Sequence, residues 1–189
     1  MFIQTEDTPN PATLKFLPGK TILESGTLEF KTKDDAKDNN LARELFLNEN
    51  VSGVFIGKDF LTITKVENVE WEILKPTLLS TILDFFTTGN QISNEGPGEQ
   101  DSREKIKYSK EDLVIVKKIN ELLDERIKPA VAQDGGDISF VKLKQGVVFL
   151  ELRGACSGCP SSTITLKSGI ENMLKYYIPE IVSVEAVNQ

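Results

Sequence analysis

The sequence predicts an α+β fold made of two small α+β domains joined by a flexible polar linker. Each half of the chain mixes short segments of alternating apolar and polar residues with longer segments whose apolar residues recur every three or four positions. These two periods are typical of strands and of helices. Residues 91–108 are polar, with Gly-Pro-Gly at 96–98, and cannot offset the entropy lost on ordering. We therefore expect domains at 1–90 and 109–189, each of ordinary size for a small domain.

The N-terminal domain is expected to combine strands and two helices. Strands are predicted at 2–6, 13–17, 26–32, 51–57 and 59–65, with a turn at Asp7–Pro11 and a hairpin turn at Gly57 to Asp59. A short helix is predicted at 40–48 and a longer one at 69–89, where Pro76 must either kink the helix or begin a second one. The longer helix has an apolar stripe that we expect to be core rather than docking surface: Trp71, Leu74, Leu78, Leu79, Ile82, Phe85 and Phe86.

The C-terminal domain is expected to follow the order α-β-β-α-β, with a small mixed sheet covered by helices. Ser109 can cap the first helix, with Asp112 three residues later, and Gly135 and Gly136 permit positive φ and a sharp reversal after it. Two strands, 138–143 and 147–153, form a hairpin through Gln145 and Gly146. A second helix spans 160–178, and a last strand lies within 181–188. The expected apolar faces are Ile115, Ile119, Leu122, Leu123 and Ile127 on the first helix and Leu166, Ile170, Met173, Leu174 and Tyr177 on the second.

Composition narrows the possible partners and compartments. The net charge of −7 argues against a general affinity for nucleic acid, which needs a concentrated basic surface. No stretch approaches the roughly 20 apolar residues of a membrane helix, so no membrane partner is expected. The N-terminal residues resemble neither a secretory signal nor an Arg-rich presequence. We expect a bacterial cytoplasmic protein, with the mitochondrial matrix as the alternative if the chain is a processed form.

Cys156 and Cys159 are the only cysteines, and the chain has no histidine. A C-x-x-C pair serves a metal site, a redox reaction or a disulfide, and the low cysteine count argues against a disulfide scaffold. The motif lies between a predicted strand and a helix whose first position suits Pro160. Unpaired amides at a helix start stabilise thiolate, as Arg153 would if its side chain turned that way. We therefore expect both cysteines to be exposed and reactive, with lowered pKa values.

Ligand number then separates the candidate chemistries. Structural zinc wants four Cys or His ligands, and a carboxylate such as Asp134 or Asp137 would be an unusual addition. Iron–sulfur clusters also want four thiolates, which two chains related by a two-fold axis would supply. A thioredoxin-like thiol-disulfide oxidoreductase also places C-x-x-C at a helix start, although in a βαβ context. On the residues alone, cluster carrier and oxidoreductase both stay open.

Two longer motifs carry a family resemblance. The run GACSGCPSSTITLKSGIENMLKYYIPE, with VAQDGGDI before it, resembles the C-terminal domain of NifU-like (Nfu-type) iron–sulfur cluster proteins, and MFIQTEDTPNPATLKFLPG resembles the N-terminal domain of that family. The resemblance implies a scaffold or carrier, not an enzyme. It implies that Cys156 and Cys159 bind a labile cluster, [4Fe–4S] or else [2Fe–2S], bridging a homodimer. It further implies upstream cluster donors and recipient apoproteins as partners.

Overall fold

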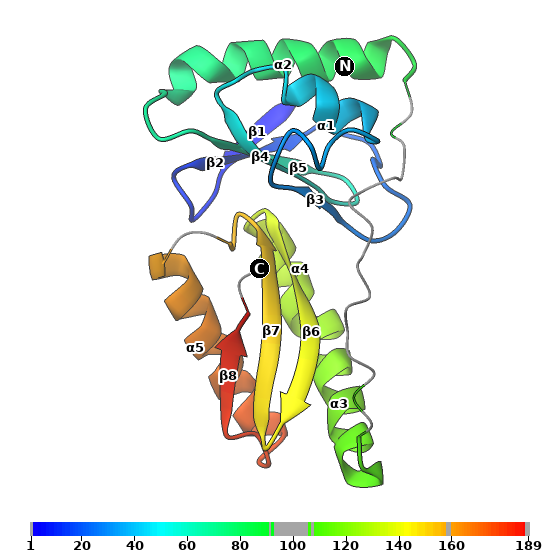
Figure 1. Ribbon diagram of the computed structural model, residues 1–189, viewed down its shortest axis with the longest axis vertical. Helices are drawn as coiled ribbons and strands as arrows, with labels where there is room; N and C mark the ends of the chain where they lie inside the picture. Colours follow the sequence, from blue (N-terminus) through cyan, green and yellow to red (C-terminus); the bar gives the residue numbers. More distant parts are fainter. Residues whose placement is uncertain (1, 91, 93–105, 107, 158–159, 188–189) are drawn as a thin grey trace. The chain divides into compact units, whose positions relative to one another are not determined.

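A computed structural model describes residues 2–90, 92, 106, 108–157 and 160–187, with only the backbone of 160–162 (Figure 1). The chain divides into two compact units, Met1–Glu99 and Gln100–Gln189. Both units contain helices and a sheet, which confirms the predicted pair of α+β domains. The expected linker, 91–108, lies almost wholly outside the described residues. Among the described residues, no helix has the length and apolarity that a membrane crossing requires.

The N-terminal unit is a five-stranded antiparallel sheet with two helices. Its strands lie in the order β1-β2-β5-β4-β3, and both helices lie on one side of the sheet (Figure 1). The elements are β1 (Gln4–Asp7), β2 (Thr13–Leu17), β3 (Leu28–Phe30), α1 (Asn40–Leu45), β4 (Val51–Ile56), β5 (Leu61–Lys65) and α2 (Trp71–Thr87). Each corresponds to a predicted segment, most with slightly shorter bounds.

The core of this unit explains the apolar stripe of α2. Its buried members are Leu74, Leu78, Ile82, Phe85 and Phe86, while Trp71 and Leu79 are partly buried against them. Trp71 also donates an Nε1–H hydrogen bond to the Pro11 carbonyl at 3.0 Å. The stripe is therefore core, as predicted. The helix continues through Pro76, which excludes the alternative that Pro76 begins a second helix.

The C-terminal unit has the predicted α-β-β-α-β order. Its elements are α3 (Lys110–Leu122), the π-helical turn η1 (Leu123–Ile127), α4 (Lys128–Gln133), β6 (Gly136–Lys144), β7 (Val147–Gly154), α5 (Pro160–Tyr177) and β8 (Ser183–Ala186). Strand β7 is antiparallel to β6 and parallel to β8, so the sheet is mixed. The hairpin turns through Gln145 (φ 52°) and Gly146 (φ 75°), the positive φ angles that a two-residue turn demands.

Two details of this unit differ from the sequence prediction. A π turn interrupts the expected first helix just before Pro129, which has no N–H to donate to the carbonyl of Glu125. Tyr177, expected in the buried stripe of α5, is 43% exposed and lies with its ring 5.1 Å from the guanidinium carbon of Arg126. Ile178, one position later, is the buried residue instead.

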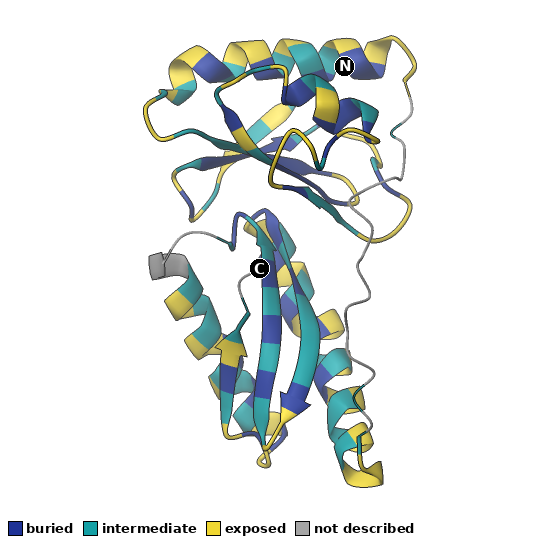
Figure 2. Cartoon of the chain, viewed as in Figure 1, coloured by how far each residue is buried: buried dark blue, intermediate teal, exposed yellow. Residues whose placement is uncertain are grey.

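One face of the C-terminal sheet is the core face. Along β7, buried and half-buried residues alternate (Figure 2), with Val148, Leu150 and Leu152 on the buried side. These pack with Ile119, Leu123, Ile127, Val131, Ile138, Leu143, Cys156, Ile170, Leu174, Ile178, Ile181 and Val184. At the start of α3, Ser109 accepts a hydrogen bond from the Asp112 amide at 3.0 Å, which confirms the predicted cap.

Candidate functional site

The segment after β7 is brought against the segment before β6 by the pairing of the two strands. Gly136 pairs with Gly154, and Asp137 pairs with Arg153, at the end of the ladder. One step further, the Ala155 amide donates a hydrogen bond to the Gly135 carbonyl at 3.1 Å. The loop after β7, which carries Cys156, therefore lies directly beside residues 134–137.

Gly136 makes the closest approach to the cysteine. A Cβ atom at this position would lie 2.7 Å from Cys156 Sγ and 2.6 Å from the Arg153 carbonyl oxygen. Both distances are well inside van der Waals contact, so only glycine fits without displacing its neighbours. Gly135 has the predicted positive φ, 81°, but Gly136 does not. The sequence prediction was therefore right for Gly135 and gave the wrong reason for Gly136, which is constrained by space.

The loop that holds Cys156 is fixed by short-range hydrogen bonds. The Ser157 amide and hydroxyl both donate to the Gly154 carbonyl, at 3.1 and 2.8 Å. The Thr163 hydroxyl, one turn into α5, donates to the Cys156 carbonyl at 3.3 Å. Helix α5 begins at Pro160, as predicted. Cys159, the second candidate ligand, lies outside the described residues.

Cys156 contradicts the expectation of an exposed, acidic thiol. It is 5% exposed and belongs to the hydrophobic core of the unit. Burial raises the pKa of its thiol to about 12, and the charges of Asp134 and then Asp137 add to the shift. Arg153 was expected to stabilise the thiolate if its side chain turned toward the cysteine. Its guanidinium forms an ion pair with Glu151 at 2.8 Å, and Arg153 is not among the causes of the shifted pKa of Cys156. At neutral pH Cys156 is therefore a buried and protonated thiol.

The described residues do not complete a metal shell by themselves. Among residues 2–90, 108–157 and 160–187, no group of three or more His, Cys, Asp or Glu side chains has an arrangement that would hold a metal ion. The sulfurs of the C-x-x-C motif stay the donors that the sequence predicts. Ordinary sequence reasoning missed the part played by Gly136, although the neighbouring pair Gly135-Gly136 was a visible signal.

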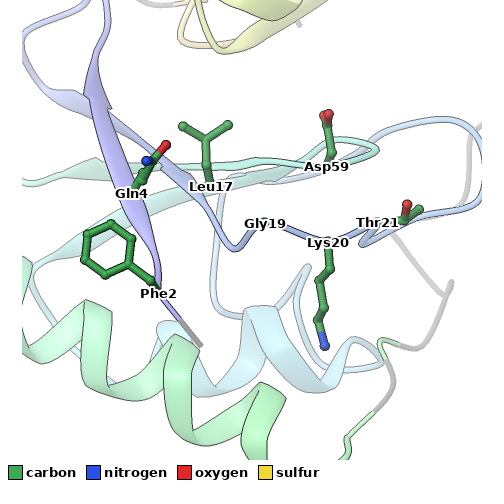
Figure 3. Close-up of a pocket in the computed structure, with 7 residues that line it drawn as sticks. All are labelled: Phe2, Gln4, Leu17, Gly19, Lys20, Thr21 and Asp59. Carbon is green, nitrogen blue, oxygen red and sulfur yellow. The ribbon is translucent and has the colours of Figure 1, made fainter.

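The N-terminal unit has an open pocket of about 540 Å³, lined by Phe2, Gln4, Leu17, Gly19, Lys20, Thr21 and Asp59 (Figure 3). The Lys20 ammonium lies 4.0 Å from the centre of the Phe86 ring, where it makes a cation–π contact. The lining contains no sulfur ligand, so the pocket is no candidate for soft-metal chemistry.

Comparisons with known proteins agree in both halves of the chain. Residues 3–89 match the family model of the scaffold protein Nfu/NifU N terminal, and residues 119–185 match that of the NifU-like domain. The human mitochondrial protein named NFU1 iron-sulfur cluster scaffold homolog is 50% identical over 188 residues, covering 99% of this chain and 72% of its own. Its namesake in Drosophila sechellia is 48% identical, and this chain spans 65% of its length.

A solved structure also resembles part of the chain. The solution NMR structure of a NifU-like protein from Saccharomyces cerevisiae is 33% identical and covers 50% of this chain and 86% of that one, with a TM-score of 0.45. The two family models together span most of the sequence, and the human relative matches nearly all of it. The chain belongs to the Nfu/NifU family, with an Nfu-type N-terminal domain and a NifU-like C-terminal domain.

Proposed function

We propose that this chain is an iron–sulfur cluster scaffold that binds a labile cluster as cargo and passes it to recipient apoproteins. Membership of the Nfu/NifU family supports an iron–sulfur cluster as the cargo. The observation that carries the proposal is the setting of Cys156, a sulfur held beside Gly136 at the junction of β7 and α5 in the NifU-like domain. The other half of the same C-x-x-C motif is Cys159.

Cys156 and Cys159 would be the cluster ligands, and two chains would share one cluster. A cluster with full cysteine ligation needs four thiolates, and one chain offers two. The loaded form is therefore a homodimer bridged at the C-terminal domains, and we assign it a [4Fe–4S] cluster. Recipient cysteines would replace the thiolates of one chain and then of the other, so that the dimer separates as the cluster leaves.

The burial of the Cys156 thiol favours a cluster carrier over a thiol-disulfide oxidoreductase. A thiol-disulfide oxidoreductase needs an accessible thiolate near neutral pH. Cys156 is buried, and its pKa is raised to about 12. Iron can displace the thiol proton on binding, so that cluster uptake releases protons. We therefore propose a non-enzymatic role, in which Cys156 becomes accessible only when cluster is loaded or transferred.

The relatives also bear on where the chain works. The human and fly proteins are named as mitochondrial, which supports the mitochondrial alternative. The expected bacterial cytoplasmic location receives no support from them. We propose that the chain acts in mitochondria, between upstream cluster donors and recipient apoproteins.

Anaerobic reconstitution with iron and sulfide tests this function. We expect about one [4Fe–4S] cluster per two chains by Mössbauer spectroscopy and iron analysis, and a dimer by sedimentation. Cys156→Ser and Cys159→Ser should each abolish stable cluster binding, while Ser168→Ala, an exposed change on α5, should not. A monomer that holds one intact cluster without added thiol would refute the shared site. Strong disulfide reductase activity with trapped mixed disulfides would instead support the redox alternative.

A further inference from the structure

The Thr163 hydroxyl makes a hydrogen bond that helix α5 does not need for itself. Thr163 lies in the first turn of α5, and its hydroxyl donates to the Cys156 carbonyl, seven residues earlier, at 3.3 Å. A threonine inside a helix ordinarily bonds to the carbonyl four residues earlier, as Thr81 of α2 does with the Thr77 carbonyl at 3.1 Å. The Thr163 hydroxyl instead reaches past the start of its helix to the loop that carries a proposed cluster ligand.

Cys156 depends on this bond more than its neighbours in the loop do. The amides of Ala155 and Ser157 each donate to a backbone carbonyl at 3.1 Å. Within the described part of the chain, the Thr163 hydroxyl is the one hydrogen-bond partner of Cys156. The neighbouring residues therefore stay anchored when Thr163 is changed, whereas the residue that carries the sulfur loses its hydrogen bond.

We propose that the Thr163 hydroxyl holds Cys156 in its buried position and thereby competes with cluster binding. The inference rests on the proposed function and deepens it. Cys156 Sγ packs beside Gly136 in the core of the unit, and a cluster shared with a second chain would need that sulfur at a surface. Bringing the sulfur there displaces the Cys156 peptide and breaks its bond to Thr163. Thr163 is thus a positioning residue that favours release of the cluster.

The competition has a stoichiometry that follows from the shared site. A bond made only in the buried state lowers the affinity for cluster by the factor by which it favours that state. Each of the two chains contributes this factor once. Removal of the Thr163 hydroxyl from both chains should therefore raise the affinity by the square of the factor, and removal from one chain by the factor itself.

Thiol labelling measures the factor in the apo chain. Valine has the shape of threonine without its hydroxyl, so Thr163→Val removes the bond and little else. In a Cys159→Ser background, we expect Thr163→Val to raise the iodoacetamide labelling rate of Cys156 about threefold, because the bond is long and its net contribution is modest. Thr163→Ser, which keeps the hydroxyl, should label at the rate of the background. The increase should persist unchanged in low urea, as local opening does and global unfolding does not.

A competition between chains measures the effect on the cluster. Equal amounts of ¹⁵N-labelled wild-type chain and unlabelled Thr163→Val chain, both with Cys159 intact, share a limiting quantity of cluster under anaerobic conditions. Native mass spectrometry separates the three loaded dimers by mass. For a threefold factor, the wild-type, mixed and variant dimers should carry cluster in a ratio of about 1 to 6 to 9. Thr81→Val, the matched control, removes a hydroxyl that bonds within its own helix. It should leave the labelling rate unchanged and give a ratio of about 1 to 2 to 1.

Several outcomes would overturn the proposal. An unchanged labelling rate means that Thr163 does not hold the thiol, and a rate that rises only with urea assigns it a general structural role. Faster labelling with an even share of cluster removes the competition, and a cluster that prefers wild-type chains means that Thr163 helps to bind it. If Thr163→Val does not fold, Thr163→Ala decides by the same two measurements. A wild-type chain that takes up no cluster overturns the proposed function and the competition with it, and the labelling rates then still show whether Thr163 holds the thiol.

Discussion

Gly136→Ala should destabilise the C-terminal unit and release Cys156 from its buried position. The new Cβ would lie 2.6 Å from the Arg153 carbonyl oxygen and 2.7 Å from Cys156 Sγ. The carbonyl belongs to the β7 backbone, which is paired with β6 at this position and yields little. The sulfur belongs to a loop and is the group that will move. Overpacking of this kind costs about 1–3 kcal/mol, or roughly 5–20 °C in Tm for a unit of this size.

Two probes separate this effect from general damage. Trp71 is the single tryptophan of the chain and lies in the other unit, so its fluorescence reports unfolding of the N-terminal domain. We expect Gly136→Ala to lower the urea midpoint seen by far-UV circular dichroism in the C-terminal transition and to leave the Trp71 transition unchanged. In a Cys159→Ser background, Cys156 of the variant should also react faster with iodoacetamide.

Gly169→Ala is the matched control. Gly169 lies in α5, and a Cβ there would meet no atom within 4 Å. Alanine in a helix is favoured over glycine by roughly 0.5–1 kcal/mol, so this variant should be slightly more stable than wild type. If Gly136→Ala is as stable as Gly169→Ala and its thiol is no more reactive, the close packing of Gly136 on Cys156 is wrong.

Three other predictions concern single groups of the C-terminal unit. Glu171 accepts hydrogen bonds from Lys175 and from the Val184 amide, which lower its pKa. Its contribution to stability is present above pH 4.5 and is lost as the pH falls through the lowered pKa. Glu171→Gln should therefore unfold at lower urea concentration than wild type at neutral pH, and the two should converge in acid. In apo Cys159→Ser, the iodoacetamide labelling rate of Cys156 should still be rising at pH 10, because its pKa is about 12; a plateau by pH 9 would contradict the burial. Ser109→Ala removes the cap of α3 and should cost about 1 kcal/mol in a thermal melt, with no change in cluster content.

Predictions of secondary structure from the sequence were most accurate where the structure depends on residues adjacent in the chain. The strand Thr13–Leu17 was predicted with its observed bounds, next to the predicted turn at Asp7–Pro11. The hairpin at Gln145 and Gly146 follows from local turn chemistry. The π turn before Pro129 is a local feature too, but a single proline permits several helix distortions, and its sequence does not choose among them.

Cys156 and Cys159 stay predicted cluster ligands, but the environment expected for Cys156 was wrong. The helix start suggested an exposed cysteine with a lowered thiol pKa. That argument considers only residues near Cys156 in sequence. The burial arises from the pairing of Gly136 with Gly154, which are 18 positions apart. That contact helps to remove the thiol from water, and desolvation is the largest cause of its raised pKa.

The packing of Cys156 and the proposed binding of a cluster compete for the same sulfur. Cys156 Sγ is packed beside Gly136, whereas a cluster shared with a second chain, as proposed, would need that sulfur at a surface. Any interaction that favours the closed loop therefore weakens cluster binding by the same free energy, because both equilibria share the closed state. The hydrogen bonds from Ser157 and Thr163 that hold the loop belong to this balance. If the chain carries its cargo as proposed, this competition would favour transfer, because the return of Cys156 to its place beside Gly136 would help to release its sulfur from the departing cluster.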